Sequence, residues 1–558
     1  MATSVPPTPP AALEVEPSVW TPLRHPLYRA LWTASCVSFM GTWMHEVGAG
    51  WLMTSLAPSP LLVSLVQTAG TAPMIFLALP SGALADVVDR RRLLLGTQLW
   101  MLGVAATLGF LTTTGHTSAY VLLLLTFALG VGNALNGPAW QALTPELVPR
   151  AELASAVSLG AIAVNLARAV GPALGGFIVG RWGPGAAFFT NAASFLAVIA
   201  VLASWKRAPR ASLVPAERVA GAMRAAVRYV KNAPELSAVL VRTGLFVACA
   251  SATWGLMPLV ARKKLELDAH GYGMLLGALG LGAVAGAAAL PRVRTRLSAE
   301  GRIALGTLAF ASSAVALGVL RQPVLVGFAM AIAGGGWLTA MATFNVLTQT
   351  SVPGWIRARA MALYMLVFQG GLALGAAGWG ALAERVGLDT TMLVSAAGLL
   401  AGIVLGRGFR VKDPRQDQFE PSRLWPAPKP AAPLDADRGP VLVTIEYRID
   451  PRRADEFRAI AEDMGAIRRR DGAYAWGLFG DVADPSRQME AFVVESWEEH
   501  VRQHDRMTFA DREVQALLRQ FHVPSEPPIV HHLVSGFPTG IGDALAEAAR
   551  TTRDTAEP

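Results

Sequence analysis

Long apolar runs separated by short polar stretches dominate the chain from Trp32 to Leu405. A helix needs about 20 such residues to cross roughly 30 Å of hydrocarbon. The pattern predicts twelve spanning helices, at residues 32–56, 61–84, 93–113, 119–143, 153–178, 186–205, 237–261, 270–291, 302–320, 324–347, 357–382 and 388–406. The long gap between the sixth and seventh runs divides them six and six.

The composition agrees with a membrane protein, because only 16% of residues are charged and 53% are hydrophobic, against about 25% charged in soluble domains. Basic residues gather in alternate loops, so the positive-inside rule predicts a multi-pass protein of the cell inner (plasma) membrane with both termini in the cytoplasm. The run Arg262–Lys264 would face outward and contradicts this pattern. The net charge of +8 belongs to loops beside anionic lipid, so we expect no nucleic-acid partner.

The two sets of six runs contain an internal repeat with an offset of 204 residues, best seen between residues 140–160 and 344–364. Matching pairs include Pro149 with Pro353, Gly171 with Gly375, Gly176 with Gly380 and Gly183 with Gly387. Parallel repeats of six helices are typical of transporters with a central binding site. Chance similarity between apolar helices is the alternative, and the equal placement of the loop prolines disfavours it.

The remaining segments differ in composition from the helices. Residues 217–232 favour a basic amphipathic helix on the inner leaflet, or equally a solvated linker helix. After a proline-rich linker, strand and helix patterns alternate as β-α-β-β-α-β, which predicts a ferredoxin-like domain. The predicted segments are a disordered tail (1–20), a first helical bundle (21–205), a cytoplasmic loop (206–236), a second bundle (237–410), the linker (411–439), the ferredoxin-like domain (440–538) and a C-terminal tail (539–558).

The loop after the second run carries the sequence GALADVVDRRR. It resembles the helix 2–3 signature of the major facilitator superfamily, with matches at Gly82, Leu84, Asp86, Arg90, Arg91 and Arg92, while Val87 departs from the usual basic residue. A glycine permits close helix packing, and a carboxylate at a helix end can pair with an arginine. We therefore expect a latch at the inner gate; the alternative is that the arginines only fix topology.

The fifth run contains NLARAVGPALGG, from Asn165 to Gly176. It resembles the antiporter-type signature of exporters in that superfamily, with matches at Gly171, Pro172, Gly175 and Gly176. Pro172 would kink the helix and the glycines would allow tight packing, and packing without directional meaning is the alternative.

Together with GTWMHEVGAGWLM and GPAWQALTPELVPRAEL, this segment is similar to the exporter branch that contains the enterobactin exporter and the transmembrane secretion effectors. The resemblance covers roughly residues 20–410, although His45 stands where that branch often has glutamine. It implies an α-helical transporter that exports a siderophore, drug or secondary metabolite by alternating access, with helices 1, 4, 7 and 10 along the path.

Two charged residues fall near the middle of spans, Glu46 in the first and Arg168 in the fifth. A charge there costs about 3 kcal/mol or more unless it is paired or hydrated. We expect Glu46, with His45, to respond to protons and Arg168 to stabilise its charged form, and a static ion pair is the alternative.

Polar and aromatic residues in other spans are candidates for a substrate cavity. Their types favour an amphipathic or aromatic solute over a small ion, although each alone is more often a packing residue. The candidates are Trp43, Gln67, Asn133, Asn136, Trp140, Gln141, Trp337, Phe344, Asn345 and Gln369.

The C-terminal domain resembles the antibiotic-biosynthesis-monooxygenase-like dimeric barrels, which implies a possible homodimer. No catalytic set transfers to it, so we expect no enzyme activity and no cofactor. His500 and His504 have metal-ligand spacing, but a solvated helix face is favoured, and His531 and His532 should point to opposite faces of a strand. The sequence therefore favours no metal site.

The best interpretation is a secondary transporter for a small organic molecule, coupled to protons. An oxygenase-type domain that acts on the transported molecule is one alternative. A membrane sensor that binds without transporting is another.

Overall fold

The computed structural model describes residues 18–205, 227–413, 418–420, 422, 435, 438–523 and 527–535. The predicted N-terminal and C-terminal tails, and most of the loop and linker, lie outside these residues. Of the predicted amphipathic helix, only the end is described, and residues 227–231 are helical.

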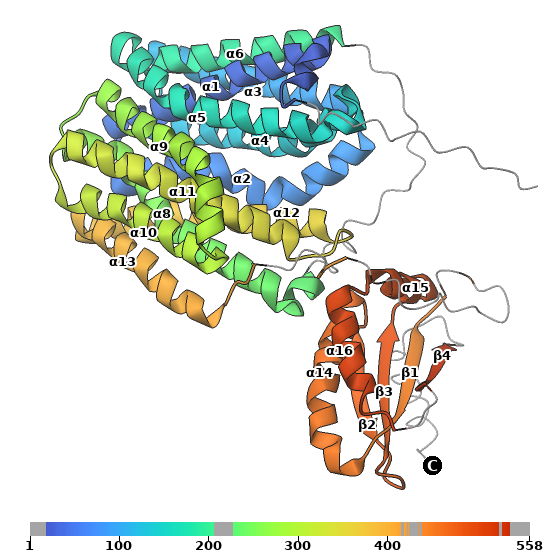
Figure 1. Ribbon diagram of the computed structural model, residues 1–558. Coiled ribbons are helices and arrows are strands. Elements are labelled where there is room, and N and C mark those ends of the chain that lie inside the picture. Colours follow the sequence, from blue (N-terminus) through green and yellow to red (C-terminus); the bar gives the residue numbers. More distant parts are fainter. Residues whose placement is uncertain are drawn as a thin grey trace, which may run out of the picture.

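Two bundles of long helices make up the membrane part, as Figure 1 shows. The first contains α1 (Pro26–Leu56), α2 (Pro60–Val87), α3 (Arg90–Thr113), α4 (Ala119–Leu147), α5 (Leu153–Trp182) and α6 (Pro184–Ser204). The second contains α8 (Pro234–Lys263), α9 (Ala269–Arg296), α10 (Ala299–Val319), α11 (Pro323–Thr350), α12 (Arg357–Val386) and α13 (Leu388–Leu405). Short 3₁₀ turns occur at η1 (Thr21–Arg24), η2 (Arg150–Glu152), η3 (Gly406–Gly408) and η4 (Pro451–Arg453).

Eleven helices among the described residues are long and apolar enough to cross a membrane. The helix outside that set is α1, which has 31 residues but includes Arg29, His45 and Glu46. α1 packs against α5 and α6 and carries His45 and Glu46 on the side that faces the interior between the bundles. These polar residues lower the mean hydropathy of the helix. The described part of the chain thus forms two helical bundles with eleven candidate membrane spans.

The two bundles repeat one another in detail. Gly183 ends α5 and begins α6, and Gly387 ends α12 and begins α13. Both have a positive φ, 85° and 84°, a conformation that glycine adopts without the steric cost that a β-carbon would impose. These two residues are separated by the offset of the internal repeat, so the sequence repeat corresponds to a structural one.

The repeated glycines also make equivalent contacts between helices. A β-carbon on Gly171 would lie 2.6 Å from the Trp43 β-carbon on α1, and one on Gly375 would lie 2.6 Å from the Ala248 carbonyl oxygen on α8. Gly176 packs in the same way on Gly273 of α9, in the other bundle. Its counterpart Gly380 packs on α2, so the bundles cross at two symmetry-related places.

The C-terminal domain is a four-stranded antiparallel sheet with the order β2-β3-β1-β4 and helices on one face. Its elements are β1 (Val441–Arg448), α14 (Ala454–Asp471), β2 (Ala475–Gly480), β3 (Arg487–Val494), α15 (Trp497–Arg506), α16 (Phe509–Arg519) and β4 (Ile529–Val534). This is the order expected for a ferredoxin-like domain. The difference from the prediction is that the second helix is split at Met507.

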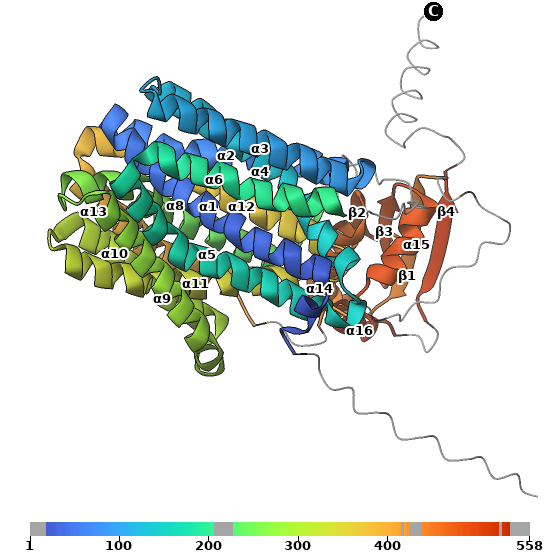
Figure 2. The ribbon, with the colours of Figure 1, turned by 90° about the horizontal axis from the view of Figure 1, so that it is seen from above.

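The domain lies beside one end of the bundles, here called the tail end, as Figure 2 shows. The Arg506 guanidinium lies 4.4 Å from the centre of the Trp355 ring in the α11–α12 junction. Arg228, just before α8, forms an ion pair of 3.4 Å with Glu499 on α15. The opposite end of the bundles, with the α1–α2, α8–α9 and α12–α13 junctions, is called the far end.

Candidate functional site: a cavity between the two bundles

A cavity of about 320 Å³ lies between the two bundles, lined by residues of α1, α2, α4, α5, α6, α8, α9, α11 and α12. Its size falls within the lower range of small-molecule sites. Because it is shared by both repeats, any movement of one bundle against the other changes its shape.

Glu46 and Arg168 both line this cavity, as the sequence predicted. The Glu46 side chain is exposed to the cavity, and the Arg168 guanidinium lies 5.9 Å from the centre of the Trp43 ring. Within the described part of the chain neither charge has an ion-pair partner, although each acts electrostatically on the other. A direct ion pair, the alternative that the sequence left open, is not formed in this conformation.

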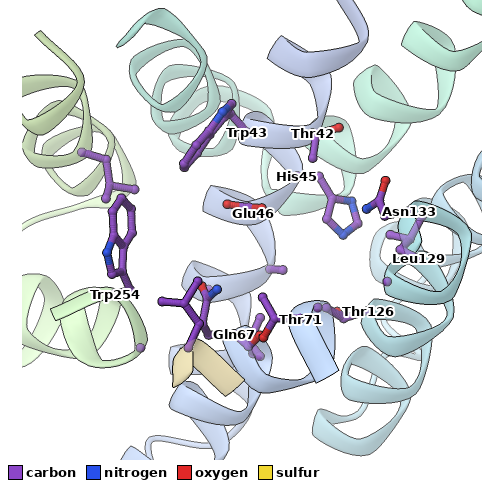
Figure 3. Close-up of a pocket in the computed structure, with 18 of the residues that line it drawn as sticks. Thr42, Trp43, His45, Glu46, Gln67, Thr71, Thr126, Leu129, Asn133 and Trp254 are labelled. Atoms are coloured by element: carbon purple, nitrogen blue, oxygen red, sulfur yellow. The ribbon is translucent and has the colours of Figure 1, made fainter. Parts of the chain in front are cut away.

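His45 is directed away from Glu46. Figure 3 shows its ring beside Asn133, while Glu46 extends into the cavity toward Trp254. The His45 ring packs 4.7 Å from the Phe188 ring centre and is only 5% exposed. Neither ring nitrogen has a hydrogen-bond partner among the described residues. Glu46 is therefore the more accessible of these two titratable side chains.

Aromatic rings form one wall of the cavity. Trp254 of α8 lies 6.3 Å from Trp43 and 5.4 Å from Trp337, between ring centres, and Trp337 lies 6.1 Å from Phe368. Sequence reasoning missed Trp254 and Phe368. One signal was available for Trp254, which lies inside the seventh apolar run. Because Trp is usually enriched at membrane interfaces, an indole away from the ends of a span indicates a special role.

Half of the polar and aromatic candidates line the cavity, and half do not. Trp43, Gln67, Asn133, Trp337 and Gln369 are in its wall. Among the others, Asn136 accepts a hydrogen bond of 3.1 Å from Thr97, and Gln349 donates one of 2.7 Å to Asn345.

The three remaining candidates lie elsewhere. Phe344 is fully buried in the core of the second bundle, Trp140 packs with residues of α3 and α6, and Gln141 is exposed. These three residues are on helices that line the cavity, α4 and α11, but on faces that turn away from it.

The helix 2–3 motif forms contacts at the tail end. Arg90 donates a hydrogen bond of 2.7 Å to Glu146 on α4, and Arg91 donates two of 2.7 Å to the carbonyls of Leu202 and Ala203 at the end of α6. These arginines thus tie α3 to two neighbouring helices.

Other parts of that motif differ from the expectation or are not described. A β-carbon on Gly82 would meet no described atom within 4 Å, so the described residues show no close helix approach there. Leu84 is 36% exposed and Arg92 is exposed, with its backbone N–H donating to the Asp89 side chain over 2.9 Å. The Asp86 side chain lies outside the described side chains.

The helix 5 motif is a packing motif in this structure. Gly171 and Gly175 contact α1, and Gly176 contacts α9. Pro172 lies inside α5, and a β-carbon on Gly273 would approach its carbonyl oxygen to 2.6 Å. Asn165 donates its side-chain hydrogen bond back to the Ala161 carbonyl of its own helix over 2.8 Å. Only Arg168 of this motif reaches the cavity.

The basic residues Arg262, Lys263 and Lys264, at the C-terminal end of α8, form polar contacts across the far end. Arg262 donates hydrogen bonds to Thr54, over 2.9 Å, and to Ser55. Lys263 donates one of 3.0 Å to the Pro58 carbonyl, and Lys264 forms an ion pair of 2.7 Å with Asp389. The first two contacts join the α1–α2 junction to the second bundle, which accounts for basic residues in this loop.

Two six-helix bundles related by an internal repeat, with a cavity between them, define a secondary transporter of the major facilitator type. Solved structures agree at the level of the fold. A bacterial homologue of the human lysosomal transporter Spinster aligns with a TM-score of 0.56 and 14% identity, over 70% of this chain and 98% of that one. The nucleoside transporter NupG aligns with a TM-score of 0.58 and 14% identity, over 69% and 99%.

The family described as "Transmembrane secretion effector" matches residues 17–538, and the chain belongs to this family of major facilitator transporters. The staphyloferrin A transporter of Staphylococcus aureus is 23% identical over 60% of this chain and 84% of its own length. The multidrug efflux pump Tap of Mycolicibacterium fortuitum is 27% identical over 68% of this chain and 95% of its own length. The macrolide efflux protein A of Streptococcus pyogenes is 21% identical over 28% of this chain.

Proposed function

We propose that this protein exports a small amphipathic or aromatic organic molecule by alternating access, coupled to the entry of protons. The observation that carries the proposal is Glu46, a carboxylate that is exposed to a cavity between the bundles and has no ion-pair partner among the described residues. Similarity to the multidrug efflux pump Tap and to the macrolide efflux protein A supports the outward direction. Similarity to these two proteins and to the staphyloferrin A transporter supports a small organic substrate.

The aromatic wall and the charges suggest how such a molecule is held. Trp43, Trp254 and Trp337 offer flat apolar surfaces for a ring system, while Gln67 and Gln369 offer amide donors and acceptors. When Glu46 is ionised, its charge balances that of Arg168, and when it is protonated the cavity gains one positive charge. Protonation therefore changes which substrates the cavity favours.

Alternating access requires that one end of the bundles closes while the other opens. In this conformation Arg262 and Lys263 join the bundles at the far end. We assign the far end to the outside and the tail end to the cytoplasm, with α1 as the twelfth span, since its 31 residues are long enough to cross the bilayer. Breaking the Arg262 and Lys263 contacts would then accompany release of the substrate to the outside.

The test uses inverted membrane vesicles with an acidic interior and fluorescent amphipathic cations as probes. The wild type should accumulate a probe only while the proton gradient lasts. Glu46→Gln keeps the size and hydrogen-bonding groups of the side chain but cannot titrate, so it should bind the probe and lose the response to the gradient. Glu462→Gln, on the exposed face of α14, is the matched control and should behave as the wild type.

Two results would contradict the proposal. Full gradient-driven accumulation by Glu46→Gln would exclude Glu46 as the coupling group. Binding of probes by the wild type without any accumulation, across the panel, would reject transport and favour a sensor.

A further inference from the structure

Three histidines converge on the C-terminal domain, away from the cavity. His500 and His504 come from successive turns of α15, and His532 comes from the strand β4. One ligand-forming nitrogen from each ring lies within 4.8 Å of the other two. The ring centres of His500 and His532 are 4.8 Å apart, and those of His500 and His504 are 5.0 Å apart.

The strand geometry explains why only one of two adjacent histidines joins this cluster. His531 and His532 point to opposite faces of β4, and His531 is exposed. His532 faces α15, beside Trp497, whose ring centre lies 6.1 Å away. Sequence spacing could pair His500 with His504, but only the fold brings His532 to them.

The buried histidine lacks the partners that a purely structural polar residue normally has. His500 is 2% exposed, and neither of its ring nitrogens has a hydrogen-bond partner among the described residues. Gln503 lies near enough to raise the pKa of His500 as a hydrogen-bonding neighbour. Its amide forms no hydrogen bond of good geometry to the ring, and its amide oxygen has no partner among the described residues. Buried polar atoms are nearly always satisfied in folded proteins, so an unsatisfied imidazole directed at two others points to a missing ligand.

We propose that His500, His504 and His532 bind a divalent transition-metal ion of the zinc class, with solvent as a fourth ligand. Three imidazoles with no carboxylate in the group favour zinc-like ions over magnesium or calcium, which prefer oxygen ligands. Three protein ligands with water in the fourth position are typical of zinc sites that keep an open coordination position.

The distances fit after a small adjustment. Tetrahedral ligands at about 2.0–2.1 Å from zinc lie roughly 3.3 Å from one another, so the nitrogens must close from at most 4.8 Å. His504 and His532 are only partly buried, and rotation of their side chains supplies this movement without displacing the core. The remaining coordination position then faces the partly exposed side of the cluster.

The bound metal would join the helix α15 to the strand β4. Among the described strands β4 is at the edge of the sheet and pairs with β1, and α15 carries Glu499, which pairs with Arg228 of the bundle region. A metal bridge from α15 to β4 would stiffen the part of the domain that contacts the transporter. We therefore expect metal to slow backbone hydrogen exchange in both α15 and β4.

The test uses the full-length protein in detergent, without an affinity tag, and Co²⁺ as the probe. The proposal predicts about one Co²⁺ per chain, with the strong visible absorption of four-coordinate cobalt, displaced by Zn²⁺. His532→Ala and His504→Ala should each weaken Co²⁺ binding at least tenfold, because the loss of one of three ligands removes a metal–nitrogen bond. His531→Ala is the matched control on the same strand and should bind as the wild type.

Hydrogen exchange of β1 and β3, measured without metal, shows whether each variant is folded. His504 is half-buried, so His504→Ala is the substitution that disturbs the core of the domain least. Co²⁺ binding that is unchanged in folded His504→Ala and His532→Ala would overturn the proposal. So would a wild-type protein that binds no Co²⁺ at 100 µM.

Discussion

The crossing of α5 with α9 permits a sharp test of how the two bundles are held together. A β-carbon at Gly176 would lie 2.6 Å from the Ala269 carbonyl oxygen and 2.8 Å from the Gly273 α-carbon, whereas one at Gly180, a single turn later, would meet only His270 atoms at 3.8 Å. Both glycines are inside α5, so both alanine substitutions gain the same helix propensity, about 1 kcal/mol. The difference between the two variants then isolates the steric cost.

That cost follows from the contacts. Backbone atoms cannot rotate away, so α9 must move by several tenths of an ångström, and overpacking of this kind costs about 1–3 kcal/mol. Gly176→Ala should therefore be less stable than Gly180→Ala by about 1–3 kcal/mol in denaturant titrations in mild detergent. Gly176→Ala should also transport more slowly.

The second crossing supplies an independent repeat of the experiment. Gly380 is the counterpart of Gly176, and a β-carbon there would approach the Leu61 α-carbon on α2 to 3.0 Å, while one at Gly378 would meet no atom of the residues that the structure describes within 4 Å. Gly380→Ala should thus be less stable than Gly378→Ala. Equal stabilities within both pairs would refute the argument that these glycines set the approach of the bundles.

Two further predictions concern charges. Arg470 is buried and donates hydrogen bonds of 2.7–3.0 Å to Asp471 and Asp511, so Arg470→Ala should destabilise the C-terminal domain by about 3–5 kcal/mol. Arg458 is in an exposed ion pair, and Arg458→Ala should cost under about 1 kcal/mol. Hydrogen exchange of β1 and β3 measures both losses, and similar exchange in the two variants would contradict this prediction. Arg262→Ala should lower the free energy of unfolding by about 2 kcal/mol in denaturant titrations, because charged hydrogen bonds across the far end are lost. The control is Arg321→Ala at an exposed position, and an equal loss in the two variants would show that the Arg262 contacts contribute nothing to stability.

The sequence predicted the architecture well because apolar periodicity and repeat spacing are local signals. Gly183 and Gly387 occupy matching positions in the sequence repeat, and both have the same positive-φ backbone conformation in the structure. The strand order of the C-terminal domain follows from its β-α-β-β-α-β pattern in the same way. The first run was predicted as a span together with the other eleven, whereas α1 is not among the eleven candidate spans, because it carries polar groups that face the cavity.

The cavity and the histidine cluster were only partly predictable because they depend on facing surfaces. Glu46 and Arg168 stood out as charges in apolar runs, but Trp254 is as apolar as its surroundings and becomes significant only through its approach to Trp43 and Trp337. Phe344 was predicted to line the cavity but lies in the core of the second bundle. A helix in a bundle has several buried faces, and the sequence does not show which of them borders the cavity. His532 lies 28 residues beyond His504, and no spacing rule joins a helix to an edge strand across that distance.

The two matching junctions of the repeat, α4–α5 and α11–α12, differ in what contacts them. Trp355 in the second junction lies under Arg506, and the neighbouring Tyr229 lies 5.7 Å from the Arg470 guanidinium. The ring and ion-pair contacts described between the C-terminal domain and the bundles thus involve residues before α8 or within the second repeat. A domain attached to one bundle alone can move with it while the cavity opens between the two, so its attachment need not prevent alternating access. A change in the stiffness of α15 would then reach the transporter through the second bundle first.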